Sequence, residues 1–233
     1  SCHLRVLLVD ADGQANATSI IPKPNESGLA AVLQGEEAYY ENVIDHTDIP
    51  NLDLLSASDE LADLDLECMA GLKQPRYFAL RDFLEVLAED DVYDLVVIDC
   101  PPYFSLSCVN AIMAADRIII PTDTDGFSTG GMGKLVRQID NLRKACPNVV
   151  ISGCLVTRWK RSDVAEDAIN YLRENGPVHI YRHVIRASDD KVRESTWAGQ
   201  AVAQWSPWSN AARDYRAWVA ELLEQEGISY EGV

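Results

Sequence analysis

The chain has 233 residues, of which 47% are hydrophobic and 24% are charged, and these values are ordinary for a folded globular protein. The formal net charge of -17 excludes binding of nucleic acid over the whole surface, because an acidic surface repels phosphates. Any DNA contact therefore needs a local basic patch. No apolar run approaches the roughly 20 residues of a membrane span, and no charged-then-apolar leader opens the sequence, so we expect a cytoplasmic protein that does not bind membranes.

Segments of strand character alternate with segments of helical character along the chain. Continuous apolar runs predict buried strands, and apolar residues at helical spacing predict amphipathic helices. We expect strands at 4–12, 51–55, 95–98, 117–121, 149–156 and 178–181, and helices at 27–33 (with a Ser27 cap), 75–90, 109–115, 132–145, 164–175 and 210–224. This alternation predicts an α/β fold: one doubly wound, mostly parallel sheet with helices on both faces, in a single domain over residues 1–233.

Acidic residues follow two of the apolar runs. Asp99 ends the run 95–98, which we expect to be covered on both faces, and Pro101 and Pro102 then end the strand. Asp10 and Asp12 lie two residues apart at the end of the first run. Ligands of open α/β sheets bind at the carboxyl ends of the strands, where carboxylates can hold Mg²⁺ beside phosphates. The alternative is that these acids cap turns or are simply solvated.

Six cysteines are scattered through apolar surroundings, without a C-x-x-C pair or a Cys/His cluster at metal spacing. They are Cys2, Cys68, Cys100, Cys108, Cys146 and Cys154. We expect them to be reduced residues of the core. Four tryptophans, Trp197, Trp205, Trp208 and Trp218, lie close together near the end, and we expect core or subunit packing there rather than a docking surface.

Several sequence blocks occur in an order that is typical of one family. They are VLLVDADGQANAT at 6–18, YDLVVIDCPP at 93–102, NAIMAADRIIIPT at 110–122 followed by GFSTGG, and HVIRASDDKVRESTWAGQAV at 183–202. Together they resemble the ParA/MinD group of deviant Walker A P-loop ATPases, and most specifically the ParA (Soj-like) partition ATPases. The resemblance implies a P-loop NTPase-like fold, hydrolysis of ATP, and ATP or ADP with Mg²⁺ as cofactors.

The resemblance also implies roles for individual residues. Asp99 matches the Walker B acid that binds Mg²⁺ through water, and Asp10 matches the acid beside the phosphates and the metal. Asp12 matches the switch I acid that orients the attacking water, which suits phosphoryl transfer because that reaction depends on positioning and charge stabilisation. Further matches are Gln14 and Asn16 in the same switch segment, Pro101 and Pro102 in switch II, and Thr157 and Arg158 at the start of an adenine-contacting loop.

The expected partners follow from the same resemblance. They are a second copy of the chain in an ATP-dependent homodimer, a ParB-like centromere-binding protein that stimulates hydrolysis, and nonspecific DNA. Our candidates for DNA contact are Arg182, Arg186, Lys191 and Arg193, and a second basic group consists of Arg158, Lys160 and Arg161. A solvated charged face is an equal alternative for these residues. The last helix has no lysine-rich face, which argues against a membrane-targeting tail.

One element of the family pattern does not occur in these 233 residues. The phosphate-binding loop K-G-G-x-G-K-S/T would precede the first strand, and we expect it in a longer N-terminus, with a strand that is central to the sheet. The segment 129–135, TGGMGKL, is only superficially similar, because it lacks the first lysine and has Leu135 in place of the metal-binding hydroxyl. The alternative is a non-catalytic interaction module with a degenerate ATPase fold.

Overall fold

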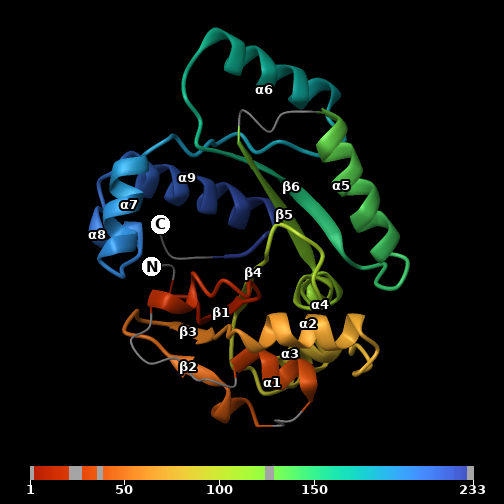
Figure 1. Cartoon of the computed structure of the whole chain (residues 1–233). Coiled ribbons are helices and arrows are strands. Elements are labelled where there is room, and N and C mark those ends of the chain that lie inside the picture. The colour runs from red at the N-terminus through yellow and green to blue at the C-terminus, as the bar shows by residue number, and fades with distance from the viewer. Residues whose placement is uncertain (1–2, 21–27, 36–38, 124–128, 230–233) are drawn as a thin grey trace. The chain divides into compact units, whose positions relative to one another are not determined.

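The structure, a computed structural model, describes residues 3–20, 28–35, 39–123 and 129–229 (Figure 1). The chain divides into two compact units, one spanning His3–Ala115 and one containing Asp116–Val233. Each unit has its own sheet, so hydrogen bonds join the described strands into two sheets instead of the single sheet that we predicted. One domain over residues 1–233 stays a prediction. In the described part of the chain, no helix has the length and hydropathy to cross a membrane.

The first unit is built on a four-stranded sheet with the order β2-β3-β1-β4. Its strands are β1 (Val6–Asp10), β2 (Ile44–His46), β3 (Leu52–Leu55) and β4 (Leu95–Asp99). Strand β1 pairs in parallel with β3 and β4, and the short β2 pairs antiparallel with β3. The mostly parallel sheet is therefore confirmed, whereas the sequence analysis missed β2, which has only three residues.

Four α-helices accompany this sheet: α1 (Gly28–Gln34), α2 (Glu60–Met69), α3 (Ala79–Glu89) and α4 (Leu106–Ala114). Short 3-10 helices lie at Thr18–Ile20 and Tyr40–Asn42. The fully buried Leu7 and Val9 of β1 belong to one apolar cluster with Leu29 of α1 and Leu80 of α3. Helix α2 was not predicted, and the predicted Ser27 cap lies outside the described residues.

Strand β4 is less covered than its apolar sequence predicts. We expected the run 95–98 to be buried on both faces, but Val97 is 45% exposed and its neighbours are only partly buried. The physical reason is that β4 is an edge strand of the four-stranded sheet, because among the described strands it pairs only with β1. A continuous apolar run thus predicted the strand correctly and its burial incorrectly.

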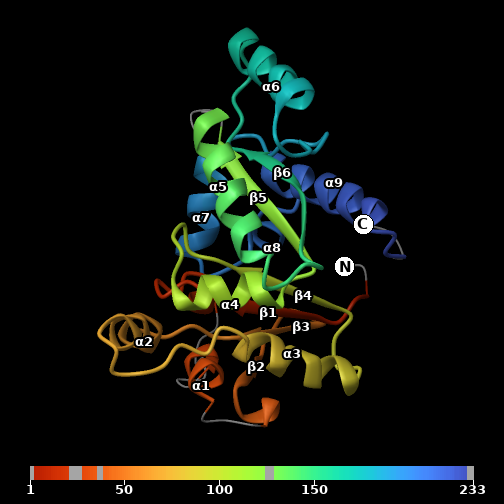
Figure 2. The same cartoon turned by 90° about the vertical axis from the view of Figure 1, so that its right-hand side faces the viewer.

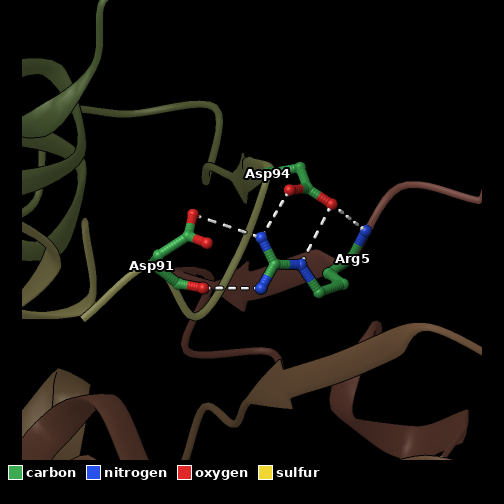
Figure 3. Close-up of polar contacts among 3 residues, drawn as sticks. All are labelled: Arg5, Asp91 and Asp94. Carbon is green, nitrogen blue, oxygen red and sulfur yellow. Dashed lines mark hydrogen bonds and ion pairs between the residues drawn. The ribbon is translucent and has the colours of Figure 1, made fainter. Parts of the chain in front are cut away.

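An ion-pair cluster joins the beginnings of β1 and β4 (Figure 3). Arg5, just before β1, places its guanidinium 2.6 Å from a carboxylate oxygen of Asp94, just before β4. The backbone N–H of Arg5 donates to the same carboxylate at 2.7 Å, and the side chain also contacts Asp91 at 3.3 Å. These contacts fix the relative register of the two strands at the end opposite to Asp10 and Asp99.

The second unit is built on a parallel pair of strands, β5 (Arg117–Asp123) and β6 (Val150–Thr157). Its helices are α5 (Thr129–Leu142), α6 (Asp163–Asn175), α7 (Asp189–Trp197), α8 (Val202–Trp205) and α9 (Asn210–Gln225). Figures 1 and 2 show α5 and α9 on opposite sides of this pair. Ile139 of α5 shares one cluster with Val156, whereas Trp218 of α9 packs on Leu155 in another. Helices therefore cover both faces here, as predicted.

One prediction for the second unit was wrong, and another is confirmed only in part. The expected strand 178–181 is reduced to a single parallel bridge between Ile180 and Cys154, flanked by hydrogen bonds from Cys154 N–H to His179 and from Tyr181 N–H to Cys154. The tryptophans do not all pack in the core: Trp197 and Trp208 are 88% and 79% exposed, and Trp218 packs beside Tyr181. Core packing is thus confirmed for Trp218, and packing of the exposed tryptophans against a second subunit stays a prediction.

Candidate functional site

The candidate site lies at the carboxyl ends of β1 and β4. Asp10 and Asp99 are register partners at the last position of the two parallel strands. The N–H of Ala11 donates to the carbonyl of Asp99 at 2.8 Å, so the strands remain hydrogen-bonded up to their ends. The two acids that the sequence analysis placed on separate apolar runs are therefore brought to one end of one sheet.

Asp10 is fully buried, and its carboxylate is occupied by hydrogen bonds. One oxygen accepts from the N–H of Thr18 at 2.7 Å and from its hydroxyl at 2.8 Å. The other oxygen accepts from the N–H of Asp12 at 3.2 Å. A buried carboxylate requires such donors, because the loss of hydration otherwise penalises its charge. Asp10 therefore organises the loop between itself and Thr18.

Thr18 is a functional position that the sequence analysis missed. Besides donating to Asp10, its hydroxyl accepts the N–H of Ala57 at 2.8 Å, just after β3. The loop that begins at β1 is thus fastened to the neighbouring strand through one buried hydroxyl. The sequence offers no signal for this contact beyond a small polar loop, because the partner lies far along the chain.

The loop after Asp10 turns sharply at Asp12. The Asp12 carboxylate accepts the N–H of Gln14 at 3.0 Å, and its carbonyl accepts the N–H of Ala15 at 2.8 Å. Ala15 has a φ of 52°, in the left-handed region that few non-glycine residues adopt. Asp12 is half-buried, and the side chains of Gln14 and Asn16 are exposed. The turn therefore presents polar groups beside the end of β1.

Asp99 interacts electrostatically with both of the earlier acids. Loss of water around its carboxyl, followed by the charges of Asp10 and Asp12, raises the pKa of Asp99 above its ordinary value. Asp99 therefore lies close enough to Asp10 and Asp12 for their charges to act on it. A bound cation would relieve this repulsion.

The segment after β4 leads into helix α4, whose first turn contacts the same site. Pro101 is buried and Pro102 is exposed, so only the second proline of the expected switch faces solvent. The hydroxyl of Ser107 donates to the carbonyl of Ala11 at 2.7 Å. Ser105 caps the helix by accepting the N–H of Cys108 at 3.0 Å. The beginning of α4 is thus held against the end of β1.

Two carboxylates at the strand ends could contribute to a cation site, namely Asp10 and Asp99. No group of three or more His, Cys, Asp or Glu residues suited to a metal ion occurs among the residues that the structure describes. Asp10 has already committed both oxygens to hydrogen bonds, whereas Asp99 is exposed. A cation held here would therefore need water or ligand oxygens in addition to protein carboxylates.

Thr157 and Arg158 belong to the second unit, at the end of β6. The Thr157 hydroxyl donates to the carbonyl of Thr122 at 3.2 Å, which joins the ends of β5 and β6. Arg158 has a φ of 51° and begins the turn that follows β6. Their predicted contact with adenine stays a prediction.

The two basic groups of the sequence analysis meet in the second unit. A depression of about 530 Å³ is lined by Trp159, Lys160, Arg161, Glu166, Arg186, Ala187 and Asn210. Several of the cations already pair with carboxylates: Arg186 contacts Asp214 at 2.7 Å and Lys191 contacts Glu194 at 2.7 Å. These pairs reduce the positive charge that the basic sequence motifs suggest, and contact with DNA stays a prediction.

Comparison with known proteins identifies the family. A family profile described as an AAA domain matches residues 2–151. The chain is 31% identical over 221 residues to the chromosome-partitioning ATPase Soj of Thermus thermophilus. The alignment covers 94% of this chain and 83% of that protein. The chain belongs to the ParA/MinD group of P-loop ATPases. A second relative in this group is the chromosome partitioning protein ParA of Caulobacter vibrioides, 29% identical over 97% of this chain and 85% of that protein.

Solved structures show the same fold. The septum site-determining protein MinD from Pyrococcus horikoshii, complexed with Mg-ADP, has a TM-score of 0.73 at 23% identity and covers 97% of this chain and 86% of its own. The cobyrinic acid a,c-diamide synthase from Mycobacterium smegmatis with bound ADP and magnesium has a TM-score of 0.76 at 23% identity, over 99% and 87% of the two chains. The predicted P-loop NTPase-like fold is therefore confirmed, as is the resemblance to the ParA/MinD group.

Proposed function

We propose that the protein is a ParA-type partition ATPase that switches between states as it binds and hydrolyses ATP. The observation that carries the proposal is the pairing of Asp10 and Asp99 at the ends of adjacent parallel strands, with Asp12 in the following turn. Relatives of the chain over most of its length are named as chromosome partitioning proteins, which supports the biological role.

ATP or ADP with Mg²⁺ is the cofactor that we propose. Two solved structures of the same fold contain ADP and magnesium. The residues at the site fit a hard cation, because carboxylate oxygens are its preferred protein ligands and Asp10 and Asp99 are register partners at the ends of adjacent strands. Mg²⁺, when bound, neutralises charge on the phosphates. Asp99, the exposed acid, would hold the ion through water, and the remaining acceptor capacity of Asp10 would contribute beside it.

The three acids have different tasks in this proposal. Asp12 is the catalytic residue, whose half-buried carboxylate orients the attacking water. Asp10 acts chiefly on the chain itself, because its hydrogen bonds to Thr18 hold the turn that carries Asp12, Gln14 and Asn16. Pro101 and Pro102 lie between Asp99 and α4, where a change at the phosphates would be transmitted to the helix. Thr157 and Arg158 would contact the adenine.

The remaining parts of the proposal concern partners. Two copies of the chain would enclose ATP, and a ParB-like protein would stimulate hydrolysis and release of the dimer from DNA. The dimer would bind DNA through Arg182, Arg186, Lys191 and Arg193. The protein would be cytoplasmic, and associated with the nucleoid when it binds DNA. The phosphate-binding sequence K-G-G-x-G-K-S/T is absent from residues 1–233, so every test uses the complete protein that its gene encodes.

Nucleotide binding is measured by calorimetry with ATP in the presence and absence of Mg²⁺. We expect Mg²⁺-dependent binding that Asp99→Asn weakens strongly, while Asp94→Asn, at the opposite end of the same strand, leaves it unchanged. Absence of binding by the complete wild-type protein would overturn the proposal and favour a non-catalytic interaction module. Equal binding by wild type and Asp99→Asn would remove the metal role from Asp99.

A further inference from the structure

A small cavity lies in the first unit between helices α1, α2 and α4. Its volume is about 190 Å³, below the roughly 300–1,000 Å³ of sites for drug-sized ligands, so it admits only a short chain of atoms. The apolar part of its lining consists of three buried leucines, one from each helix: Leu33, Leu64 and Leu106. The polar part consists of Gln34 at the end of α1 and of three exposed residues between α2 and α3: Lys73, Gln74 and Arg76. The apolar groups therefore line the inner side of the cavity and the polar groups line its opening.

Arg76 brings a positive charge to this opening without a carboxylate beside it. Within the described residues, its guanidinium has neither a hydrogen-bond partner nor an ion-pair partner. The residue is nevertheless held in place, because its carbonyl accepts the Asn110 amide N–H at 2.9 Å. Its side chain lies against Gly35, where a Cβ atom would overlap the guanidinium. A positioned guanidinium with free N–H groups is suited to bind an anion through two parallel hydrogen bonds.

The other cation at the opening is already neutralised. Lys73 places its Nζ 3.0 Å from a carboxylate oxygen of Glu67 and also donates to the side-chain oxygen of Gln34. Gln74, by contrast, has no side-chain hydrogen bond among the residues that the structure describes, so its amide N–H groups are available as donors. The cavity thus offers one uncompensated positive charge and one neutral donor, which matches a ligand with a single negative charge.

We propose that this cavity binds a short aliphatic carboxylate. The carboxylate would accept hydrogen bonds from Arg76 and Gln74, and the aliphatic part would lie on the three leucines. A planar carboxylate matches the guanidinium fork, whereas inorganic phosphate would press polar oxygens against leucines that cannot donate to them. The same chemistry occurs in a free organic acid and in the last residue of a polypeptide that ends in an aliphatic side chain. This inference goes beyond the proposed function and does not rest on it.

The test is a titration of the complete protein, without nucleotide, followed by saturation-transfer difference NMR. We expect saturable binding of isocaproate and none of isocaproamide, which has a similar shape but no charge. A peptide that ends in leucine with a free carboxylate, compared with its amide, is the second arm. Tighter binding of the acidic peptide would assign the carboxylate to a polypeptide end, and binding of isocaproate alone would assign it to a small molecule. Absence of saturable binding by both acids would overturn the proposal, as would competition by inorganic phosphate at the same concentrations.

Three variants locate the binding site. Arg76→Gln removes the charge and should weaken binding of the acid by about tenfold or more, because hydrogen bonds to a charged group are lost. Gln74→Glu adds a carboxylate at the opening and should weaken binding as well. Arg81→Gln, on α3 and outside the cavity lining, is the matched control and should bind like wild type. If Arg76→Gln does not fold by urea denaturation, Gln74→Glu decides. Equal affinity of wild type and a folded Arg76→Gln would overturn the proposal, whereas failure to bind ATP counts against the proposed function alone.

Discussion

The buried carboxylate of Asp10 holds Thr18 through two hydrogen bonds, at 2.7 Å from the N–H and 2.8 Å from the hydroxyl. The same hydroxyl accepts the N–H of Ala57, so one side chain joins β1, its following loop and the end of β3. The position of Asp12 depends on this arrangement, because the loop that carries Asp12 is fixed at both of its ends.

Thr18→Val should therefore destabilise the fold. The substitution keeps the side-chain shape but removes a donor to a buried charge and leaves the Ala57 N–H without its acceptor. We expect a loss of about 1–3 kcal/mol in the free energy of unfolding, measured by urea denaturation. Thr18→Ser keeps the hydroxyl and should lose much less. Equal losses in the two variants would show that packing of the methyl group, and not the hydroxyl, stabilises the loop.

Asn110 is a second buried polar residue whose contacts predict a large effect. Its amide oxygen accepts the N–H of Leu80 at 3.2 Å, and its amide nitrogen donates to the carbonyls of Arg76 and Leu106 at 2.9 and 3.1 Å. Asn110→Ala leaves these groups unsatisfied and opens a cavity, so we expect a loss of about 2–4 kcal/mol by urea denaturation. Asn141→Ala, on the exposed face of α5, is the control and should change stability little. A loss in Asn110→Ala no larger than in this control would contradict the assigned contacts.

The Arg5–Asp94 pair predicts how stability depends on pH. Hydrogen bonds from the side chain and backbone of Arg5 lower the pKa of Asp94 from 3.8 to about 2. The folded state therefore binds the Asp94 proton more weakly than the unfolded state, and the pair stabilises the fold above the ordinary carboxyl pKa. This contribution is lost as the pH falls from 3.8 to about 2.

The measurement compares wild type with Asp94→Asn over a pH series of denaturation curves. The stability difference between them should be constant from neutral pH to about pH 5 and should shrink below pH 4, because Asp94 becomes protonated in wild type. Asp82→Asn, on the exposed side of α3, is a matched carboxylate control. A difference that stays constant down to pH 2 would mean that Arg5 does not stabilise the charged form of Asp94.

The basic residues of the second unit should separate into two classes. Arg186 binds the mostly buried Asp214, so Arg186→Ala should lower stability. The double variant Arg182→Ala/Arg193→Ala, at two exposed positions, should instead weaken DNA binding of the complete protein and flatten its salt dependence. Fluorescence anisotropy with a nonspecific duplex at several salt concentrations distinguishes the classes. Unchanged DNA affinity in the double variant would remove these two residues from the proposed contact.

Much of the first unit could be predicted from sequence, because two of its strands, β1 and β4, are continuous apolar runs that end in acids. Those runs placed Asp10 and Asp99 at the ends of parallel strands, where the structure pairs them. The contacts of Thr18 and the exposure of Cys100, which we predicted to be a core residue, depend on how loops fold back, and no periodicity encodes that. Helix α7 was missed because its sequence, DDKVRESTW, has no apolar stripe. The exposure of Val97 could not be predicted either, since an apolar run does not show whether its strand lies inside a sheet or at its end.

The central claim is that this site hydrolyses ATP with Asp12 as the catalytic residue. The most direct measurement is single-turnover hydrolysis by the complete protein, with oligomeric state followed by size-exclusion chromatography in Mg-ATP. Asp12→Ala should bind ATP, hydrolyse it far more slowly than wild type, and accumulate as an ATP-bound dimer. Asp12→Ala turning over ATP at the wild-type rate would contradict the account.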